Sequence, residues 1–429
     1  MKYDSIIIGF GKGGKTLAGA LAKAGEKVAL IEKSKMMYGG TCINVGCIPS
    51  KSLITSAEGA RKADDKAAYY KAAINKKREL TSKLREKNFD KLNSLDNVDI
   101  INGEAKFISN NEIIVNGEAL FGEKIFINTG GTPVVPNLPG IESLDKIYFS
   151  EDLMDEENLP NNLLIVGGGY IGLEFAAMYS DFGAKVTVVQ DGDVLLPRED
   201  EDLVETIVNT LQEKGVTFKL GTNVNLKEVS KEYDGILIAT GRKPNTEGLG
   251  LENTDVKLTN RGAVVTDDNL KTDAPNIWAI GDVTGGLQFT YTSLDDYRVV
   301  LSALKDNGKY TKSDRKNVPY SVFLAPTFSR VGINEKEAKA AGIDYRVLKM
   351  PAAAIPKALV LESPQGLLKA IVDNNTNKIL GAMLYCKDSH EMINLVKLAM
   401  DMEVDYKVLR DMVFTHPTMS EALNDLFSL

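Results

Sequence analysis

A pattern of glycines between an apolar strand and a helix occurs twice in this chain, and it constrains the fold more than any other feature. The first copy, GFGKGG at residues 9–14, follows the apolar run 5–9 and opens an alanine-rich helix. The second copy, GGGYIG at residues 167–172, follows the apolar run 163–166. Glycines at these positions permit a tight turn and let a pyrophosphate approach the backbone. Two such βαβ units, about 160 residues apart, predict two nucleotide-binding domains of the Rossmann type.

The residues around each glycine turn predict the nucleotide that it binds. The amides and the positive dipole end of the helix that follows favour phosphate groups. In the first unit Glu32 ends the second strand, where a carboxylate can accept hydrogen bonds from a ribose. In the second unit Gln190 takes this place, beside Asp191, and the nearest downstream basic residue is Arg198. Because a 2′-phosphate requires a nearby cation, we expect NADH rather than NADPH. The candidate phosphate-binding glycines are Gly9, Gly11 and Gly14, and Gly167, Gly169 and Gly172.

The segment GTCINVGCIPSK at residues 40–51 contains Cys42 and Cys47, two of the three cysteines in the chain. On a regular helix, residues five apart have Cα atoms about 8–9 Å apart, whereas a disulfide needs about 4.4–6.8 Å. The segment must therefore be distorted for a bond to form, and Gly46 can help. Distortion makes a disulfide easier to reduce, and a helix N-terminus would lower the pKa of a thiol. The pair predicts a redox-active disulfide; the alternative is two independent buried cysteines.

Composition argues against several other functions. The formal charge of −8 and the pI near 5.2 argue against nucleic acid or an anionic membrane as a partner. No signal segment is recognisable at the start and no apolar run is long enough to span a bilayer, so we expect a cytoplasmic protein. Two histidines and the third cysteine, Cys386, are too few for a closed zinc site, and no metal site is predicted.

Taken together, these motifs resemble those of the class I pyridine nucleotide–disulfide oxidoreductases, which include dihydrolipoamide dehydrogenase, glutathione reductase and mercuric reductase. The similarity covers essentially the whole chain and includes ATGRKPN at 239–245, AIGD at 279–282 and FTHPTMSE at 414–421. It implies an α/β fold with two Rossmann-like domains, for FAD and NAD(P)H, and an α+β C-terminal dimerisation domain. The implied domains are FAD-binding at 1–149 and 246–313, NAD(P)H-binding at 150–245, and dimerisation at 314–429.

The same resemblance implies roles for individual side chains. Cys42 would meet the substrate, and Cys47 would face the flavin. Lys51 and Glu174 would pair near the flavin edge that receives hydride. The remaining implied contacts are Thr41, Gly103, Ala105, Thr129, Gly130 and Asp282 to FAD, and Gly241 to NAD(P)H.

His416, paired with Glu421, would act as the acid–base group for the cysteines of the partner subunit, so the resemblance implies an active homodimer. Thiol chemistry needs a proton carrier near neutral pH, and a carboxylate on the other ring nitrogen fixes the tautomer of the histidine. We expect structural or surface roles for His390 and Cys386.

The substrate is predicted from two further segments. Residues 281–298 differ from those of dihydrolipoamide dehydrogenases; like residues 416–427, they are similar to the reactive-chlorine-resistance flavoproteins, a subgroup associated with reducing hypothiocyanous acid and with copper resistance. We therefore expect a small oxidant as substrate. The alternatives are a dihydrolipoamide dehydrogenase, another disulfide or metal-ion reductase, and a non-enzymatic FAD-bearing redox sensor. A cluster in this run either shapes the substrate approach or packs in the core: Phe289, Tyr291, Tyr297 and Arg298. The short segment 221–234 predicts a reduced β-meander in the NAD(P)H domain.

Overall fold

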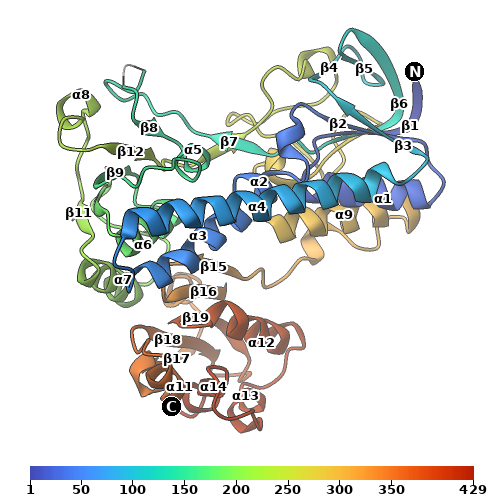
Figure 1. Ribbon diagram of the computed structural model, residues 1–429. Helices are drawn as coiled ribbons and strands as arrows, with labels where there is room; N and C mark the ends of the chain where they lie inside the picture. Colours follow the sequence, from blue (N-terminus) through green and yellow to red (C-terminus); the bar gives the residue numbers. More distant parts are fainter. Residues whose placement is uncertain (143) are drawn as a thin grey trace.

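The first glycine motif belongs to a seven-stranded sheet at the N-terminal end of the molecule (Figure 1). The structure is a computed structural model that describes residues 1–142 and 144–429. The strand order is β3-β2-β1-β6-β5-β4, with β14 paired to β6. Because β14 follows the second glycine motif in sequence, this sheet uses chain from both sides of that motif. Its strands are β1 (Lys2–Ile8), β2 (Val28–Glu32), β3 (Val98–Asn102), β4 (Ala105–Phe107), β5 (Glu112–Val115), β6 (Glu118–Ile127) and β14 (Ile277–Ala279).

Parallel strands form the nucleotide-binding half of this sheet, since β1 pairs in parallel with both β2 and β6. The turn between β5 and β6 is tight: Asn116 and Gly117 have φ angles of 52° and 83°, as a type I′ hairpin requires. Helices α1 (Lys12–Lys23) and α9 (Thr290–Lys305) pack side by side against the sheet. A Cβ on Gly13 would lie 2.6 Å from the Ser293 carbonyl oxygen, so this glycine allows the close helix contact.

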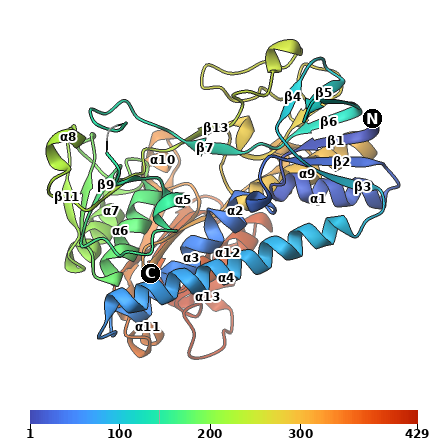
Figure 2. The same cartoon turned by 45° about the horizontal axis from the view of Figure 1, so that its top comes forward.

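Three helices follow the first βαβ unit, and the last two pack against each other. They are α2 (Thr41–Asn44), α3 (Cys47–Ala60) and α4 (Lys66–Asn93). Figures 1 and 2 both show α4 running along the molecule from the first sheet to the second, with α3 packed against it. The cysteine segment therefore lies between the two nucleotide-binding units.

The second glycine motif belongs to a five-stranded parallel sheet of order β11-β10-β9-β12-β8. Between β11 and β12 the chain forms only the short helix α8; residues 220–234, all of which the structure describes, contain no strand, which confirms the reduced β-meander. The strands β7 (Gly131–Pro133) and β13 (Arg242–Pro244) pair antiparallel and connect the two units. The other elements are β8 (Ile147–Tyr148), α5 (Ser150–Leu153), β9 (Asn162–Val166), α6 (Tyr170–Phe182), β10 (Lys185–Val189), α7 (Glu201–Glu213), β11 (Thr217–Lys219), α8 (Leu226–Val229) and β12 (Gly235–Ile238).

The C-terminal part is an antiparallel sheet of order β15-β16-β19-β18-β17, covered by helices. One apolar cluster joins this sheet to α3 and α6, through residues such as Leu53, Leu173 and Phe328. This shared core fixes α3 against both later parts of the chain. The elements are β15 (Tyr320–Phe323), β16 (Thr327–Gly332), α10 (Glu335–Ala340), β17 (Tyr345–Pro351), α11 (Pro356–Val360), β18 (Leu367–Asp373), β19 (Ile379–Cys386), α12 (Ser389–Asp401), α13 (Lys407–Asp411) and α14 (Ala422–Leu426).

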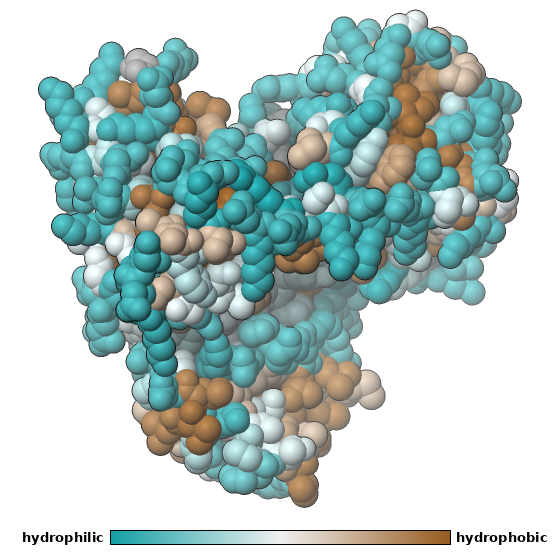
Figure 3. Space-filling view, viewed as in Figure 1, coloured by the Kyte–Doolittle hydropathy of each residue, from teal (hydrophilic) through white to brown (hydrophobic). Residues whose placement is uncertain are grey.

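Apolar side chains are exposed on the C-terminal part, at the lower end of the molecule in Figure 3. Val413 is 94% exposed and Met402 is 68% exposed, which is unusual for apolar residues unless a partner covers them. Others are Leu359, Val360, Leu398 and Val408. None of the helices within the described residues combines the length and apolar character needed to cross a membrane. The domain boundaries expected from the sequence remain a prediction.

Candidate active site

Cys42 and Cys47 lie on two consecutive helices that are separated by a break. Cys42 is in α2, and Cys47 is the first residue of α3. Between them Gly46 leaves helical geometry, with φ −128° and ψ −116°. A Cβ on Gly46 would lie 3.0 Å from the Thr41 carbonyl oxygen and 3.3 Å from the Cys42 Cα, so the break closes tightly around this residue. The distortion predicted from the spacing is this break. Both cysteines are thiols in the structure, and their side chains share a hydrogen bond.

The two thiols have opposite acidities. The hydrogen bond from Cys42, together with the Thr290 hydroxyl and the charge of Lys51, lowers the pKa of Cys47 and outweighs the desolvation of its sulfur by the surrounding protein. The Thr290 Oγ1 lies 3.6 Å from the Cys47 Sγ. The N-terminus of α3 adds a favourable dipole, since Cys47 is its first residue. The same shared hydrogen bond, reinforced by burial, raises the pKa of Cys42. Cys47 is therefore the thiolate of the pair, and Cys42 retains the proton.

An ion pair lies one helical turn beyond Cys47. The Lys51 Nζ donates to both carboxylate oxygens of Glu174, at 3.0 and 2.8 Å. Glu174 lies on α6, which opens at the second glycine motif. The backbone N–H of Phe323, in β15, donates to the Glu174 Oε1 at 2.9 Å. The two residues predicted to pair are therefore brought together, and a third part of the chain meets them.

The first glycine turn forms a close-packed cradle. Gly9 has a φ of +106°, and a Cβ there would lie 2.3 Å from the Asn128 carbonyl oxygen. A Cβ on Gly11 would meet the Asn128 side chain at 2.7 Å. At the end of β2, the Glu32 Oε2 accepts the Phe10 N–H at 3.0 Å. Each carboxylate oxygen has a second lone pair that a ribose hydroxyl can use. The cradle fits a dinucleotide with its phosphates at the N-terminus of α1.

Asp282 supplies an acceptor further along the same face. It lies in the 3₁₀ turn Gly281–Thr284 that follows β14. Its carboxylate accepts no hydrogen bond from the described residues, and burial together with repulsion from Asp296 raises its pKa despite the charge of Arg242. A half-buried carboxylate without a donor fits a polyol such as the ribitol of FAD.

The remaining residues predicted to contact FAD surround this cradle. The Thr129 hydroxyl donates to the Asn245 carbonyl at 2.6 Å, and the Asn245 N–H donates to Gly130 at 2.9 Å. Gly103 donates its N–H to the Glu32 carbonyl at 3.1 Å, whereas the Ala105 side chain packs into the core of the first sheet. Thr41 is the first residue of α2. The side chain of Ala105 is therefore not available to a ligand.

The second glycine turn repeats the geometry of the first. Gly167 has a φ of +110°, and a Cβ there would lie 2.5 Å from the Ala239 carbonyl oxygen. A Cβ on Gly172 would lie 2.0 Å from the Gly167 carbonyl oxygen. The Gln190 Oε1 accepts the Gly168 N–H at 2.8 Å, as Glu32 accepts that of the corresponding residue in the first unit. Gly169 precedes α6, and Gly241, with a φ of +114°, follows β12. This turn fits a second dinucleotide.

His416 lies in the C-terminal part. Its Nδ1 is 2.9 Å from the Glu421 Oε2, and the hydrogen bond from His416 lowers the pKa of Glu421. The Glu421 Oε1 also accepts the Thr418 N–H at 3.0 Å, which fixes the carboxylate. Figure 1 shows α14 at the lower end of the molecule, far from α2. The structure therefore does not bring His416 to Cys42 within one chain.

Three contacts at the site were missed by the sequence reasoning: those of Thr290, Phe323 and Lys15. Lys15 follows the first glycine motif, and its Nζ donates to the Gly39 carbonyl at 3.3 Å and to the Asn88 Oδ1 at 2.5 Å. Burial lowers the pKa of Lys15 to about 8, and its charge acts to lower that of Cys42. A lysine directly after the last glycine of such a motif was the available signal.

The predicted aromatic and polar cluster is only partly formed. Phe289 stacks on Tyr291 with ring centroids 5.1 Å apart, and on Tyr320 at 6.1 Å. Tyr297 instead packs against the core beside α1, and Arg298 turns to Asp295 at 3.2 Å. For Tyr297 the packing favours the core alternative, whereas Arg298 lines the same hollow as Tyr291, and the role of the cluster toward substrate remains a prediction.

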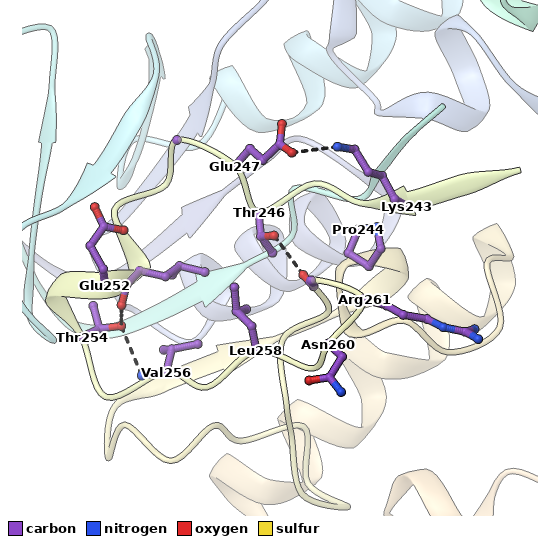
Figure 4. Close-up of a pocket in the computed structure, with 13 residues that line it drawn as sticks. Lys243, Pro244, Thr246, Glu247, Glu252, Thr254, Val256, Leu258, Asn260 and Arg261 are labelled. Carbon is purple, nitrogen blue, oxygen red and sulfur yellow. Dashed lines mark hydrogen bonds and ion pairs between the residues drawn. The ribbon is translucent and has the colours of Figure 1, made fainter. Parts of the chain in front are cut away.

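Two hollows lie apart from the cysteines and the two glycine turns. One, of about 680 Å³, is lined by residues between Lys243 and Gly262 and includes none of the predicted site residues (Figure 4). The other, of about 550 Å³, lies beside α9 and α12 and is lined by charges of both signs, and it reaches Tyr291.

Comparison with known proteins identifies the class. The family model of the pyridine nucleotide-disulphide oxidoreductases matches residues 3–296, and that of their dimerisation domain matches residues 318–427. The chain belongs to this family and is an oxidoreductase enzyme with a dimerisation domain, and the family implies FAD and a pyridine nucleotide as cofactors.

Particular relatives are close over their full length. The probable pyridine nucleotide-disulfide oxidoreductase RclA of Escherichia coli K12 is 51% identical, covering 100% of this chain and 99% of that protein. The solved structure of the HOCl-induced flavoprotein disulfide reductase RclA from Escherichia coli has a TM-score of 0.95 at 50% identity, covering 100% of both chains. A dihydrolipoyl dehydrogenase of Bacillus subtilis is 33% identical over 99% of this chain and 97% of that protein.

Proposed function

We propose that this enzyme uses NADH to reduce a small electrophilic oxidant, with hypothiocyanous acid as the favoured substrate. The observation that carries the proposal is the unequal thiol pair. Cys47 is a thiolate held beside Lys51, and Cys42 is a protonated thiol close to the charge of Lys15. The description of the Escherichia coli relative as HOCl-induced supports an oxidant of the reactive-chlorine type. A cytoplasmic location, where NADH is available, fits this function.

The cofactor would be held by the first glycine cradle, Glu32 and Asp282. FAD, when bound, supplies the transfer of an electron pair from the nicotinamide to the Cys42–Cys47 disulfide. Lys51 and Glu174 would orient the reacting edge of the flavin. Their ion pair fixes a positive charge one helical turn from Cys47. The Thr290 hydroxyl would hold the Cys47 thiolate by a hydrogen bond.

Reduction of the oxidant would occur at Cys42. After Cys42 gives its proton to a base, its thiolate attacks the sulfur of hypothiocyanous acid, and hydroxide leaves as water by taking one proton. Cys47 then attacks the Cys42 sulfur, which forms the disulfide and releases thiocyanate. The net reaction is hypothiocyanous acid plus NADH to thiocyanate, water and NAD⁺, which balances in atoms and charge.

The proton carrier would be the partner subunit's His416. Glu421 binds Nδ1, so Nε2 is the nitrogen left to exchange a proton. Because α14, which follows His416 closely in sequence, lies far from α2, which carries Cys42, this role requires the homodimer. The exposed apolar residues on the C-terminal part support such an assembly.

The preference for NADH rests on Gln190 and Asp191. The Gln190 amide is already engaged, by the Gly168 N–H and by the Asp191 carboxylate at 2.8 Å. A carboxylate at this point repels a 2′-phosphate. We expect a kcat/KM for NADH at least tenfold above that for NADPH, and replacement of Asp191 by serine should narrow this ratio.

Steady-state oxidation of NADH with hypothiocyanous acid, lipoamide and glutathione disulfide in parallel tests the substrate. We expect turnover with hypothiocyanous acid and little with the two disulfides. Rapid lipoamide reduction without activity toward hypothiocyanous acid would instead make the protein a dihydrolipoamide dehydrogenase. Cys42→Ser is the control, and it should abolish turnover with every substrate that reacts at this thiol.

Metal-ion reduction is a second candidate function. The Escherichia coli relative has also been solved as a Cu(II) complex, with a TM-score of 0.95 and 49% identity. The thiols of Cys42 and Cys47 are soft ligands that suit copper. Oxidation of NADH on addition of Cu(II) in place of the oxidant, and its loss in Cys42→Ser, would support this activity.

A further inference from the structure

Phe323, in β15 of the C-terminal part, contacts both members of the ion pair between Lys51 and Glu174. Its backbone N–H donates to the Glu174 Oε1 at 2.9 Å, and its ring centroid lies 4.7 Å from the Lys51 Nζ. We propose that Phe323 is a positioning residue for hydride transfer. Through it, the C-terminal domain controls the reaction of the nicotinamide with the flavin in its own subunit. The inference rests on the proposed function only for the role of the ion pair.

The two contacts of Phe323 restrain different members of the ion pair. The amide satisfies one lone pair of Glu174, which leaves the carboxylate in one orientation toward Lys51. The aromatic face attracts the ammonium from a second side. The side chains of Lys51 and Glu174 are only 30% and 11% exposed, so water screens these interactions weakly. An ammonium held by two carboxylate oxygens and a ring has little freedom to swing away.

The ring of Phe323 is itself supported from behind. The ring of His390, the second residue of α12, lies 5.2 Å from it at an interplanar angle of 49°. Across the sheet, Phe323 pairs with Thr327 of β16. The ring is therefore fixed by α12 and β16, two elements of the C-terminal domain. A shift of that domain would move the ring.

A second contact joins the C-terminal domain to α3 without touching the ion pair. The Lys387 Nζ, between β19 and α12, donates to the carboxylate of Glu58 on α3 at 3.1 and 3.2 Å. Removing it would weaken the docking of the C-terminal domain on α3 but leave Lys51 in place. Lys387→Ala is therefore the matched control for a general loosening of this interface.

Rapid-mixing measurement of flavin reduction by NADH tests the inference. Phe323→Leu keeps the backbone N–H and removes the aromatic face, and we expect reduction to slow about tenfold. Phe323→Tyr keeps the face and should stay within about twofold of the wild type. Lys387→Ala should leave the rate unchanged. Reoxidation of the reduced enzyme by the oxidant should be the same in all variants, because it occurs at Cys42.

A second readout does not depend on activity. In thermal unfolding of the holoenzyme, the losses of Tm in Phe323→Leu and Lys51→Met should be non-additive: the double variant should lose less than the sum, because both single changes break one contact. Phe323→Met replaces Phe323→Leu if the latter does not fold.

Additive losses of Tm together with unchanged flavin reduction in Phe323→Leu would overturn the inference. The inference would also be overturned if flavin reduction slowed as much in Lys387→Ala as in Phe323→Leu, since the effect would then come from weaker docking of the C-terminal domain on α3. Flavin reduction by NADH in the wild type is measured without any oxidant, so failure of the enzyme to reduce hypothiocyanous acid would contradict the proposed substrate and leave this inference intact.

Discussion

Lys51 lies one helical turn after Cys47 on α3, so the cation that pairs with Glu174 and the thiol bonded to Thr290 share one face of a helix. Helix α3 therefore holds both Lys51, at the ion pair, and Cys47, the thiolate of the cysteine pair, in fixed positions relative to each other. The break at Gly46 then leaves Cys42 on a separate helix, where it can meet a different molecule.

Replacement of the two cysteines should separate their roles. In Cys42→Ser, Cys47 keeps the contacts to Thr290 and Lys51 that favour its thiolate, so we expect a long-wavelength charge-transfer band to persist while turnover is lost. In Cys47→Ser both the band and turnover should disappear. The absorption spectrum of each holoenzyme checks this. A band in Cys47→Ser and none in Cys42→Ser would reverse the assignment.

Replacement of Thr290 should shift the titration of Cys47. The hydroxyl contributes one hydrogen bond to the thiolate, worth about 1 kcal/mol, so Thr290→Val should raise the apparent pKa of Cys47 by somewhat less than one pH unit. The pKa of this thiol is lowered on folding, so its contribution to stability is present above the unfolded pKa and lost as the pH falls through the folded value. The ultraviolet absorbance of the thiolate, followed against pH in the reduced protein, measures this pKa.

Much of this site could be predicted because its signals are local. Glycine turns, the acidic or amide residue at the end of each second strand, and the break between Cys42 and Cys47 all follow from spacing within about 20 residues. The contact of Phe323 with Glu174 joins positions 149 residues apart, and no local pattern encodes it. The two alternatives for Tyr297 could not be separated for a related reason, because its packing beside α1 accompanies a contact between Gly13 and Ser293, which are 280 residues apart.

Lys15 should control the reactivity of Cys42. Its ammonium favours the Cys42 thiolate, so Lys15→Met should slow the reaction of the reduced enzyme with the oxidant about three- to tenfold at pH 7. Because burial lowers the pKa of Lys15 to about 8, the wild type should lose this charge above that pH, and the two rates should converge. Rapid mixing across this pH range measures the difference. A constant ratio from pH 7 to pH 9 would contradict an electrostatic role for Lys15.

Intersubunit complementation should reveal whether His416 acts on the partner's cysteines. His416→Ala should reduce turnover about 10²–10³-fold while flavin reduction by NADH remains fast, because the histidine carries protons only for thiol chemistry. Glu421→Gln should show a smaller loss, since it weakens the hold on Nδ1. In a hybrid dimer of Cys42→Ser with His416→Ala, one of the two sites carries both changes and the other carries neither. Random mixing makes half of the dimers hybrids, so co-expression should restore about a quarter of wild-type turnover. If each active site were built from one chain, every site in the mixture would carry one change and no turnover would return. The hybrid, purified with a different tag on each subunit, should show about half of wild-type turnover, which separates failed mixing from a site within one chain.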